Sequence, residues 1–217
     1  METGVRQMGA ELIGIVGHTS RLAQIETLAQ QVEADYISID DGTLGCDGSH
    51  RKVLTRLANS DDPWAIILED DAQPINNFTE QATLALAAAP TPIVSFYLGT
   101  SRPPSYQARI QAATTNADHI HYLQARRLLH AVAYAIHTEL IPDFLGYQSA
   151  RPIDEAITAW ANHHGHGITH TWPSLTDHED GPTLFAHPDG APRTKPRKAW
   201  RVGTRETWDG TAVRVMG

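Results

Sequence analysis

The chain has 217 residues, of which 41% are hydrophobic and 19% charged, and its formal net charge is −8. This size and composition fit one globular domain with a substantial core. No stretch approaches the roughly 20 apolar residues that span a bilayer, and residues 1–11 lack the apolar core of a signal peptide. We therefore expect a cytoplasmic protein without membrane insertion.

The first half of the chain alternates apolar runs with helical patterns. The apolar runs predict strands at residues 12–16, 36–39, 64–68 and 93–98. Apolar residues at helical spacing predict a helix that Thr19 or Ser20 caps and that extends to residue 32, and further helices at residues 50–57 and 79–89. This β-α-β-α-β order is typical of a parallel sheet with right-handed crossovers.

The second half is less regular. Its patterns predict strands at residues 119–123, 131–136 and 168–172, and helices at residues 137–145 and 153–163. Pro142 must restart or kink the first of these helices, whereas Pro152 suits the first turn of the second. We expect one domain over residues 1–186, followed by a mobile basic C-terminal arm over residues 187–217.

Three consecutive carboxylates end the apolar run of residues 64–68. Glu69, Asp70 and Asp71 therefore lie at the carboxyl end of a predicted buried strand, where ligands bind in open α/β sheets. Their repulsion costs stability unless a cation or hydrogen-bond donors compensate it. A divalent metal that carries a phosphate-bearing substrate is the simplest explanation. The alternative is a strand-end turn with solvated acids.

A second acidic pair, Asp40 and Asp41, ends the strand predicted at residues 36–39. In a doubly wound sheet the two acidic strand ends can meet in one crevice, where this pair would suit hydrogen bonds to a ribose or a base. The chain has no Walker-type phosphate loop and no Gly-x-Gly-x-x-Gly after its first strand. Phosphate neutralisation would therefore fall to the metal and to basic side chains such as Arg21.

Three further residues have two interpretations each. His178 lies on a predicted loop and would suit manganese as a ligand, whereas carboxylates suit magnesium better. Asp154 opens a helix, where the dipole favours a carboxylate, or it acts as a general base on an acceptor hydroxyl. Cys46 is the only cysteine, which excludes an internal disulfide and a cysteine-rich zinc site. We favour a small buried residue over a catalytic thiol there.

A basic segment lies near the end of this acidic chain. Residues 193–205 carry six cations and no acid. Such a segment suggests a polyanionic partner or a phosphate-covering loop, and a solvated tail is an equal alternative.

Five short motifs follow one another along residues 12–180. They are Gly45-Cys46-Asp47-Gly48-Ser49-His50, the Leu-Glu-Asp-Asp of residues 68–71, Phe96-Tyr97-Leu98-Gly99, Ala133-Tyr134-Ala135-Ile136 and Pro152-Ile153-Asp154. In this order and spacing they resemble glycosyltransferase family 25, which includes lipooligosaccharide and procollagen galactosyltransferases.

The resemblance implies an α/β fold of the GT-A type, a single Rossmann-like domain with a mainly parallel central sheet flanked by helices. It also implies transfer of a sugar from a nucleotide diphosphate donor, for which we expect a UDP-sugar, with Mn²⁺ or Mg²⁺ as cofactor. By position, Asp71 would be the direct metal ligand, joined by Glu69 and His178. The residues expected at the donor are Asp40, Asp41, Ser49, His50, Arg21 and Asp70, and those expected in catalysis are Asp71 and, in an inverting mechanism, Asp154.

The short chain and its basic segment also resemble glycosyltransferases encoded by bacteriophages, some of which modify hydroxymethylated pyrimidines in DNA. This resemblance implies that the protein acts in a host cytoplasm. It also ranks double-stranded DNA slightly ahead of a surface glycan or a protein as the acceptor. The residues expected to contact DNA are Arg193, Lys195, Arg197, Lys198, Arg201 and Trp200, the last by stacking on an extruded base unless it is a packing anchor. A noncatalytic nucleotide-sugar or nucleic-acid binding module and a metal-dependent phosphohydrolase are the rival classes.

Overall fold

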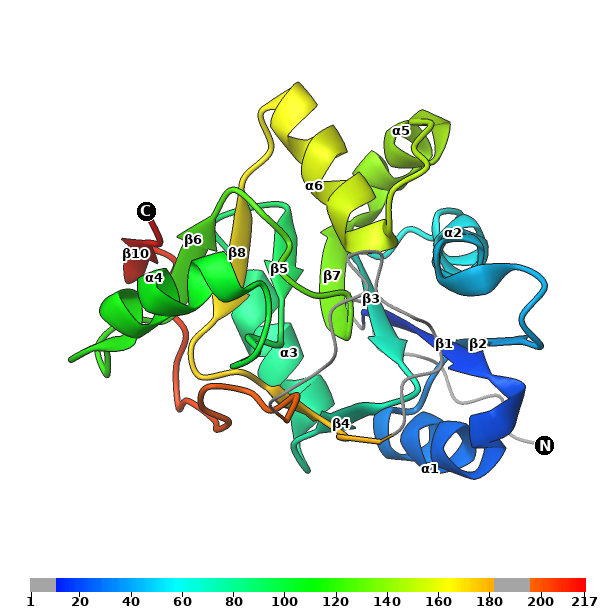
Figure 1. Cartoon of the computed structure of the whole chain (residues 1–217), viewed down its shortest axis with the longest axis horizontal. Helices are drawn as coiled ribbons and strands as arrows, with labels where there is room; N and C mark the ends of the chain where they lie inside the picture. The colour runs from blue at the N-terminus through cyan, green and yellow to red at the C-terminus, as the bar shows by residue number, and fades with distance from the viewer. Residues whose placement is uncertain (1–10, 182–195) are drawn as a thin grey trace.

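A mixed eight-stranded sheet runs through the protein, which a computed structural model describes over residues 11–181 and 196–217 (Figure 1). In spatial order its strands are β10 (Val213–Val215), β6 (Tyr122–Ala125), β8 (Ile168–Thr171), β5 (Ile93–Ser95), β7 (Ala133–His137), β3 (Trp64–Glu69), β1 (Leu12–His18) and β2 (Tyr36–Asp40). Neighbours pair in parallel except that β7 is antiparallel to β3 and β5, and β6 is antiparallel to β8.

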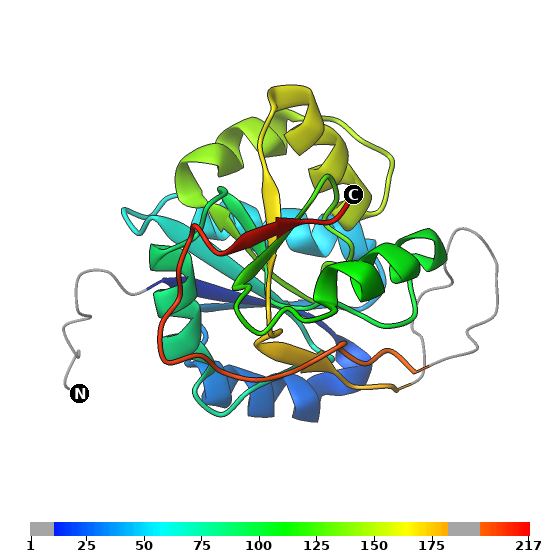
Figure 2. The ribbon, with the colours of Figure 1, turned by 90° about the vertical axis from the view of Figure 1, so that its left-hand side faces the viewer.

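Helices cover both faces of this sheet. They are α1 (Leu22–Val32), α2 (Gly45–Leu57), α3 (Phe78–Ala87), α4 (Pro104–Thr114), α5 (Ile141–Gly146) and α6 (Ile153–His164), with short 3₁₀ helices η1 (Thr19–Arg21) and η2 (Thr138–Leu140). Side chains of α1 and α3 share one core with the sheet, and those of α2, α5 and α6 share another. Figure 2 shows α1 and α6 on opposite sides of the sheet. The predicted α/β class, with a mainly parallel sheet between helices, is confirmed.

Strand β3 explains why its sequence is a continuous apolar run. Ile66 and Leu68 point into the core beneath α1 and α3, whereas Ala65 and Ile67 point into the core beneath α2, α5 and α6. All four side chains are fully buried. A strand covered on both faces has no solvated position for a charge, so the acidic residues begin only where the strand ends, at Glu69.

Helix α2 begins at Gly45, five residues before the predicted start. Asp40 accepts hydrogen bonds from the backbone N–H groups of Leu44 and Gly45 at 3.0 and 2.9 Å. The cap therefore comes from the end of β2, and the first turn has no apolar periodicity that would reveal it. Gly14 lets this helix approach β1, because a Cβ there would lie 2.3 Å from Val53 Cγ1.

Two other predictions need correction. The strand expected at residues 119–123 lies at 122–125 as β6. The stretch after β8, expected to be a polar loop, contains β9 (Thr176–His178), which pairs antiparallel with β4 (Ala72–Pro74). This pairing brings His178 opposite Ala72, directly after the acidic triplet.

The C-terminal segment over residues 196–217 is part of the fold. β10 extends the central sheet, and Trp208 is 9% exposed. The Trp208 ring packs 5.4 Å from the Tyr122 ring, and its Nε1 donates a hydrogen bond to Gln81 Oε1 at 3.2 Å. The prediction of a mobile arm is therefore wrong for these residues, because their basic, Pro- and Gly-rich composition concealed the buried side chains. The boundary expected between residues 186 and 187 lies outside the described residues.

Within the two described ranges, no helix combines the length and the apolarity that crossing a bilayer requires.

Replacing Trp208 tests whether the C-terminal segment contributes to stability. We expect Trp208→Ala to lower the free energy of unfolding by about 3 kcal/mol, because it leaves a cavity beside Tyr122 and removes one of the hydrogen bonds that Gln81 Oε1 accepts. Val202→Ala, at a side chain that is 40% exposed, is the control and should change stability by less than about 0.5 kcal/mol. Equal urea midpoints for both variants would contradict the packing described here.

Candidate active site

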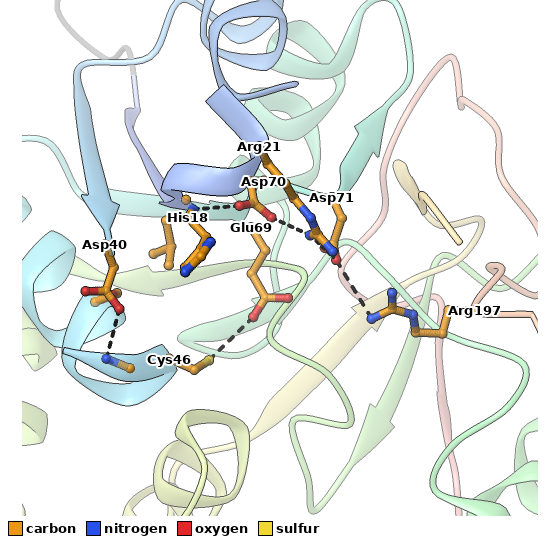
Figure 3. A pocket seen from close by; sticks show the side chains of 12 residues that line it. His18, Arg21, Asp40, Cys46, Glu69, Asp70, Asp71 and Arg197 are labelled. Carbon is orange, nitrogen blue, oxygen red and sulfur yellow. Dashed lines mark hydrogen bonds and ion pairs between the residues drawn. The ribbon is translucent and has the colours of Figure 1, made fainter. Parts of the chain in front are cut away.

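A pocket opens at the carboxyl ends of the parallel strands β1, β2 and β3 (Figure 3). The register pairs His18 with Asp40 and Val16 with Glu69, which brings the three strand ends side by side. The lining residues are Val16, Gly17, His18, Arg21, Asp40, Gly45, Cys46, Ser49, Glu69, Asp70, Asp71 and Arg197. The two acidic strand ends therefore meet at one crevice, as the parallel topology predicted.

Arg21 lies between two of the three acids. Its Nη1 donates to Asp70 Oδ1 at 2.6 Å and to Asp71 Oδ2 at 2.8 Å. Asp70 Oδ2 also accepts the backbone N–H of His18 at 2.8 Å. Burial alone would lower the pKa of Arg21, but its hydrogen bonds to Asp71 and Asp70 outweigh this and raise it. Burial raises the pKa of Asp70 despite these donors. One guanidinium thus compensates two buried carboxylates.

Asp71 and His178 face each other, and each presents an atom with a free lone pair to the other. Asp71 Oδ1 is buried and has no hydrogen-bond partner among the described residues, and His178 Nε2 lies 3.5 Å from it. His178 Nδ1 bonds to the carbonyl oxygen of Glu179, which can only accept. Nδ1 therefore carries the proton. Burial lowers the pKa of His178, so the neutral ring directs the lone pair of Nε2 toward the carboxylate.

Such an arrangement is unfavourable without a cation between the two atoms. A separation of 3.5 Å is close to that of adjacent ligands on one cation with bonds of about 2.1 Å. Oxygen and imidazole nitrogen together suit Mn²⁺, and a site with few protein ligands is common where substrate phosphates complete the coordination. The chemistry and spacing of these two residues therefore fit a divalent cation.

Glu69 points toward α2, away from Asp71 (Figure 3). Its Oε1 lies 3.2 Å from His50 Nε2 and 3.9 Å from Cys46 Sγ. Burial would raise the pKa of Glu69, but the hydrogen bond and the charge interaction with His50, together with smaller contributions from His178 and Arg197, outweigh burial and lower the pKa. The structure thus pairs Glu69 with Cys46 and His50, and not with the Asp71–His178 pair that it was expected to join.

The residues expected at the donor are only partly brought together. Asp40 lines the pocket, and the N–H of Leu44 is the main cause that lowers its pKa. Ser49 also lines it, with a buried Oγ that has no hydrogen-bond partner in the described part of the chain. Asp41 is exposed outside the lining and accepts the N–H of Thr43 at 3.1 Å. His50 is fully buried behind the lining.

Arg197 was expected to contact nucleic acid, but the structure places it in this pocket. Its Nη1 lies 3.8 Å from Asp71 Oδ2, its Nη2 donates to the carbonyl of Gly181 at 3.2 Å, and its backbone N–H donates to Asp180 at 3.2 Å. A second guanidinium thus approaches Asp71. The sequence could have indicated this position of Arg197, because a phosphate-covering loop was one of the interpretations of the basic segment.

The other members of the nucleic-acid set serve the fold. Lys198 Nζ donates to the carbonyl of His178 at 2.8 Å, and Arg201 forms an ion pair with Asp118. Trp200 Nε1 donates to Gln107 Oε1 at 3.0 Å, and its ring packs against a buried apolar cluster, so the packing-anchor interpretation describes it. Arg193 and Lys195 lie outside the described residues.

Asp154 lies in the first turn of α6, next to the pocket but outside its lining. Its Oδ1 accepts the backbone N–H of Glu155 at 2.9 Å. Burial, with a smaller contribution from the nearby Glu69 carboxylate, raises the pKa of Asp154 to about 6. Its pKa therefore suits a base that acts near neutral pH.

His18 and Gly17 are pocket residues that the sequence patterns did not single out. A Cβ at Gly17 would lie 2.3 Å from Ile25 Cδ1, so glycine is needed for α1 to pack at this strand end. Both residues lie at the carboxyl end of the first strand. The rule that ligands bind at the carboxyl ends of strands, which indicated Asp40 and Asp70, could therefore have indicated them too.

Comparison with known proteins assigns the family. Residues 19–156 match the model of glycosyltransferase family 25, described as LPS biosynthesis protein. Because this match spans more than half of the sequence, the chain belongs to glycosyltransferase family 25, and it is a glycosyltransferase. No curated protein sequence matches it.

Two solved structures are similar to this chain. The crystal structure of A197 from STIV superposes with a TM-score of 0.47 at 14% identity, covering 90% of this chain and 98% of that one. A glycosyltransferase involved in the glycosylation of the major capsid of PBCV-1 superposes with a TM-score of 0.30 at 8% identity, covering 65% and 68%. These superpositions are loose, and the family assignment rests on the sequence match.

Removing the shared guanidinium should destabilise the protein in a pH-dependent way. We expect Arg21→Met to cost about 2–3 kcal/mol at pH 7, because it leaves Asp70 and Asp71 buried together without their cation. The pKa of Asp70, already raised, should rise further, so the loss is largest at neutral pH and shrinks as protonation relieves the repulsion.

Urea unfolding at pH 7 and pH 4.5 measures this difference. Arg201→Met removes an ion pair whose side chains are 51% and 86% exposed, and it should cost less than about 1 kcal/mol. A loss for Arg21→Met that is small or independent of pH would contradict the compensation by Arg21.

Proposed function

We propose that the protein transfers a sugar from a nucleotide diphosphate donor, a UDP-sugar, that binds in this pocket together with Mn²⁺ or Mg²⁺. The observation that carries the proposal is the pair of opposed electron-pair donors, Asp71 Oδ1 and His178 Nε2, 3.5 Å apart. These two residues would hold the cation. When bound, it would stabilise the negative charge that develops on the leaving diphosphate.

The chain supplies further groups for the donor. The guanidinium groups of Arg21 and Arg197 both lie in the pocket within 3.8 Å of Asp71, where they would donate charge-assisted hydrogen bonds to phosphate oxygens. Ser49 Oγ, buried in the lining and without a partner in the described ranges, would bond to a donor hydroxyl. Asp40 would face the ribose or the base.

Asp154 is the proposed general base of an inverting transfer. Its carboxylate would take the proton of the acceptor hydroxyl as the hydroxyl oxygen bonds to the sugar and the diphosphate departs. A retaining mechanism would not need this base, so the stereochemistry of the product decides its role.

Removing the proposed cation ligand should abolish transfer without unfolding the protein. We expect Asp71→Asn to lower kcat at least about 100-fold, because the amide no longer provides the negative ligand that faces His178. Donor turnover with Mn²⁺ and the melting temperature are measured together. Asp61→Asn is the control, because this exposed acid precedes β3, whereas the pocket lies at the other end of that strand. A fully active Asp71→Asn variant would contradict the assignment.

The pH profile tests the base. Asp154 acts as the carboxylate, so with its pKa at about 6 we expect kcat to be constant above pH 7 and to fall about tenfold per pH unit well below pH 6. Asp154→Asn should remove this limb together with most of the activity. A profile that stays flat from pH 5 to pH 8 in the wild-type protein would argue against Asp154.

For the acceptor, we propose a hydroxyl of a glycan or a protein over hydroxymethylated DNA. The basic segment at residues 193–205 was the reason for ranking DNA ahead of a glycan or a protein as the acceptor. Of its four cations within the described residues, Arg197, Lys198, Arg201 and Arg205, each contacts acids or carbonyl groups of the same chain. Their charge is thus partly neutralised by the fold, which supports a neutral acceptor.

Gel retardation of a DNA duplex at several salt concentrations checks this choice. We expect weak retardation at 0.15 M salt and no difference between the wild-type protein and the triple variant Arg193→Ala, Lys195→Ala, Arg201→Ala. Tight, salt-sensitive retardation that the triple variant weakens would return DNA to first place, since phosphate contacts release counterions.

A further inference from the structure

Three potential metal ligands meet at the base of the pocket, apart from the Asp71–His178 pair. They are Cys46 Sγ and His50 Nε2 from α2 and Glu69 Oε1 from the end of β3, and all three atoms lie within 4.8 Å of one another. Cys46 and Glu69 line the pocket, while His50 is fully buried behind them. Figure 3 shows the Cys46 and Glu69 side chains pointing toward each other.

The separations of these atoms suit a small cation. Glu69 Oε1 is 3.2 Å from His50 Nε2 and 3.9 Å from Cys46 Sγ. Tetrahedral coordination with bonds of about 2.0–2.3 Å sets ligand atoms roughly 3.3–3.6 Å apart. The two separations from Glu69 Oε1 are within a few tenths of an ångström of this range, and Cys46 Sγ and His50 Nε2, which lie within 4.8 Å of each other, would approach by up to about 1.3 Å through side-chain rotation to complete the geometry.

An outer partner holds the histidine in the orientation that coordination requires. His50 Nδ1 lies 3.2 Å from the hydroxyl oxygen of Tyr134, and both side chains are fully buried. When Nδ1 donates its proton to this hydroxyl, the lone pair of Nε2 points at Glu69. Metal-binding histidines are commonly oriented by such a hydrogen bond at the second ring nitrogen.

We propose that Cys46, His50 and Glu69 form a binding site for a borderline divalent cation of the Zn²⁺ type, with its fourth position open toward the pocket. Thiolate and imidazole ligands select such a cation, whereas the carboxylate of Asp71 with substrate phosphates suits Mn²⁺ or Mg²⁺. The proposal is independent of the donor-binding function, because the two ligand sets share no residue.

Without a cation the three groups satisfy one another. Burial and the neighbouring Glu69 carboxylate raise the pKa of the Cys46 thiol, which therefore keeps its proton and donates weakly to Glu69. Binding of the cation forms a sulfur–metal bond and releases the thiol proton to solvent. The proton that His50 Nε2 donates to Glu69 in the empty site is lost from Nε2 while Nδ1 takes one up, which frees the Nε2 lone pair for the cation. One proton is therefore released in all, so the affinity should rise with pH.

Cobalt(II) titration of the full chain tests the site directly. Because Cys46 is the only cysteine, any near-ultraviolet thiolate-to-cobalt charge-transfer band reports on this site alone. We expect one equivalent of Co²⁺ to give this band and one equivalent of Zn²⁺ to abolish it. Cys46→Ser should lack the band while its fold, read by circular dichroism, is kept.

Two further variants separate coordination from packing. Tyr134→Phe removes only the hydroxyl beside Nδ1, and it should keep the band but weaken the Co²⁺ affinity about 10-fold. His178→Ala, at the other proposed cation site, should leave both the band and the affinity unchanged. No band in the wild-type protein at stoichiometric Co²⁺, or a band that persists in Cys46→Ser, would overturn the proposal. Because the readout is spectroscopic, a failure of the proposed sugar transfer would leave this result standing.

Discussion

Repulsion among the carboxylates at the end of β3 is the constraint around which the site is organised. A strand buried on both faces can carry charge only at its end, and this strand ends in three acids. Three elements stabilise these acids: Asp70 and Asp71 share Arg21 of η1, Asp71 is also approached by Arg197 of the C-terminal segment, and Glu69 pairs with α2. The pocket is the place where these elements converge.

The three acids consequently have different roles. Asp70 Oδ2 accepts the N–H of His18 and Asp70 Oδ1 accepts a hydrogen bond from Arg21, so both oxygens are engaged and Asp70 holds Arg21 in place. Asp71 shares Arg21 but keeps Oδ1 without a hydrogen bond in the described part of the molecule, facing a neutral histidine. The unfavourable electrostatics therefore concentrate on one oxygen atom, which makes Asp71 the member of the triplet with a capacity to bind a ligand.

The features that sequence patterns predicted are local ones. The apolar run of β3, the acids at the ends of β2 and β3, and the helical periodicity of α1 and α6 all follow from neighbouring residues. The family motifs located Ser49 in the lining as well. The direction in which Glu69 points could not be predicted, because the choice between α2 and Asp71 depends on packing across the pocket.

Long-range contacts account for the remaining differences. Arg197 reaches Asp71 from 126 positions along the chain, and Trp208 enters the core from a segment whose composition predicted a mobile arm. His178 meets Asp71 because β9 pairs with β4, two three-residue strands without a recognisable pattern. Such contacts leave no periodicity in the sequence, since each is a single side chain placed by the completed fold.

The position of a bound manganese ion tests the central claim most directly. Crystals grown with Mn²⁺ and UDP should show an anomalous-scattering peak about 2.2 Å from both Asp71 Oδ1 and His178 Nε2, with diphosphate oxygens completing its coordination. A peak that contacts neither atom, or a nucleotide bound in the pocket without any peak beside Asp71, would contradict the account.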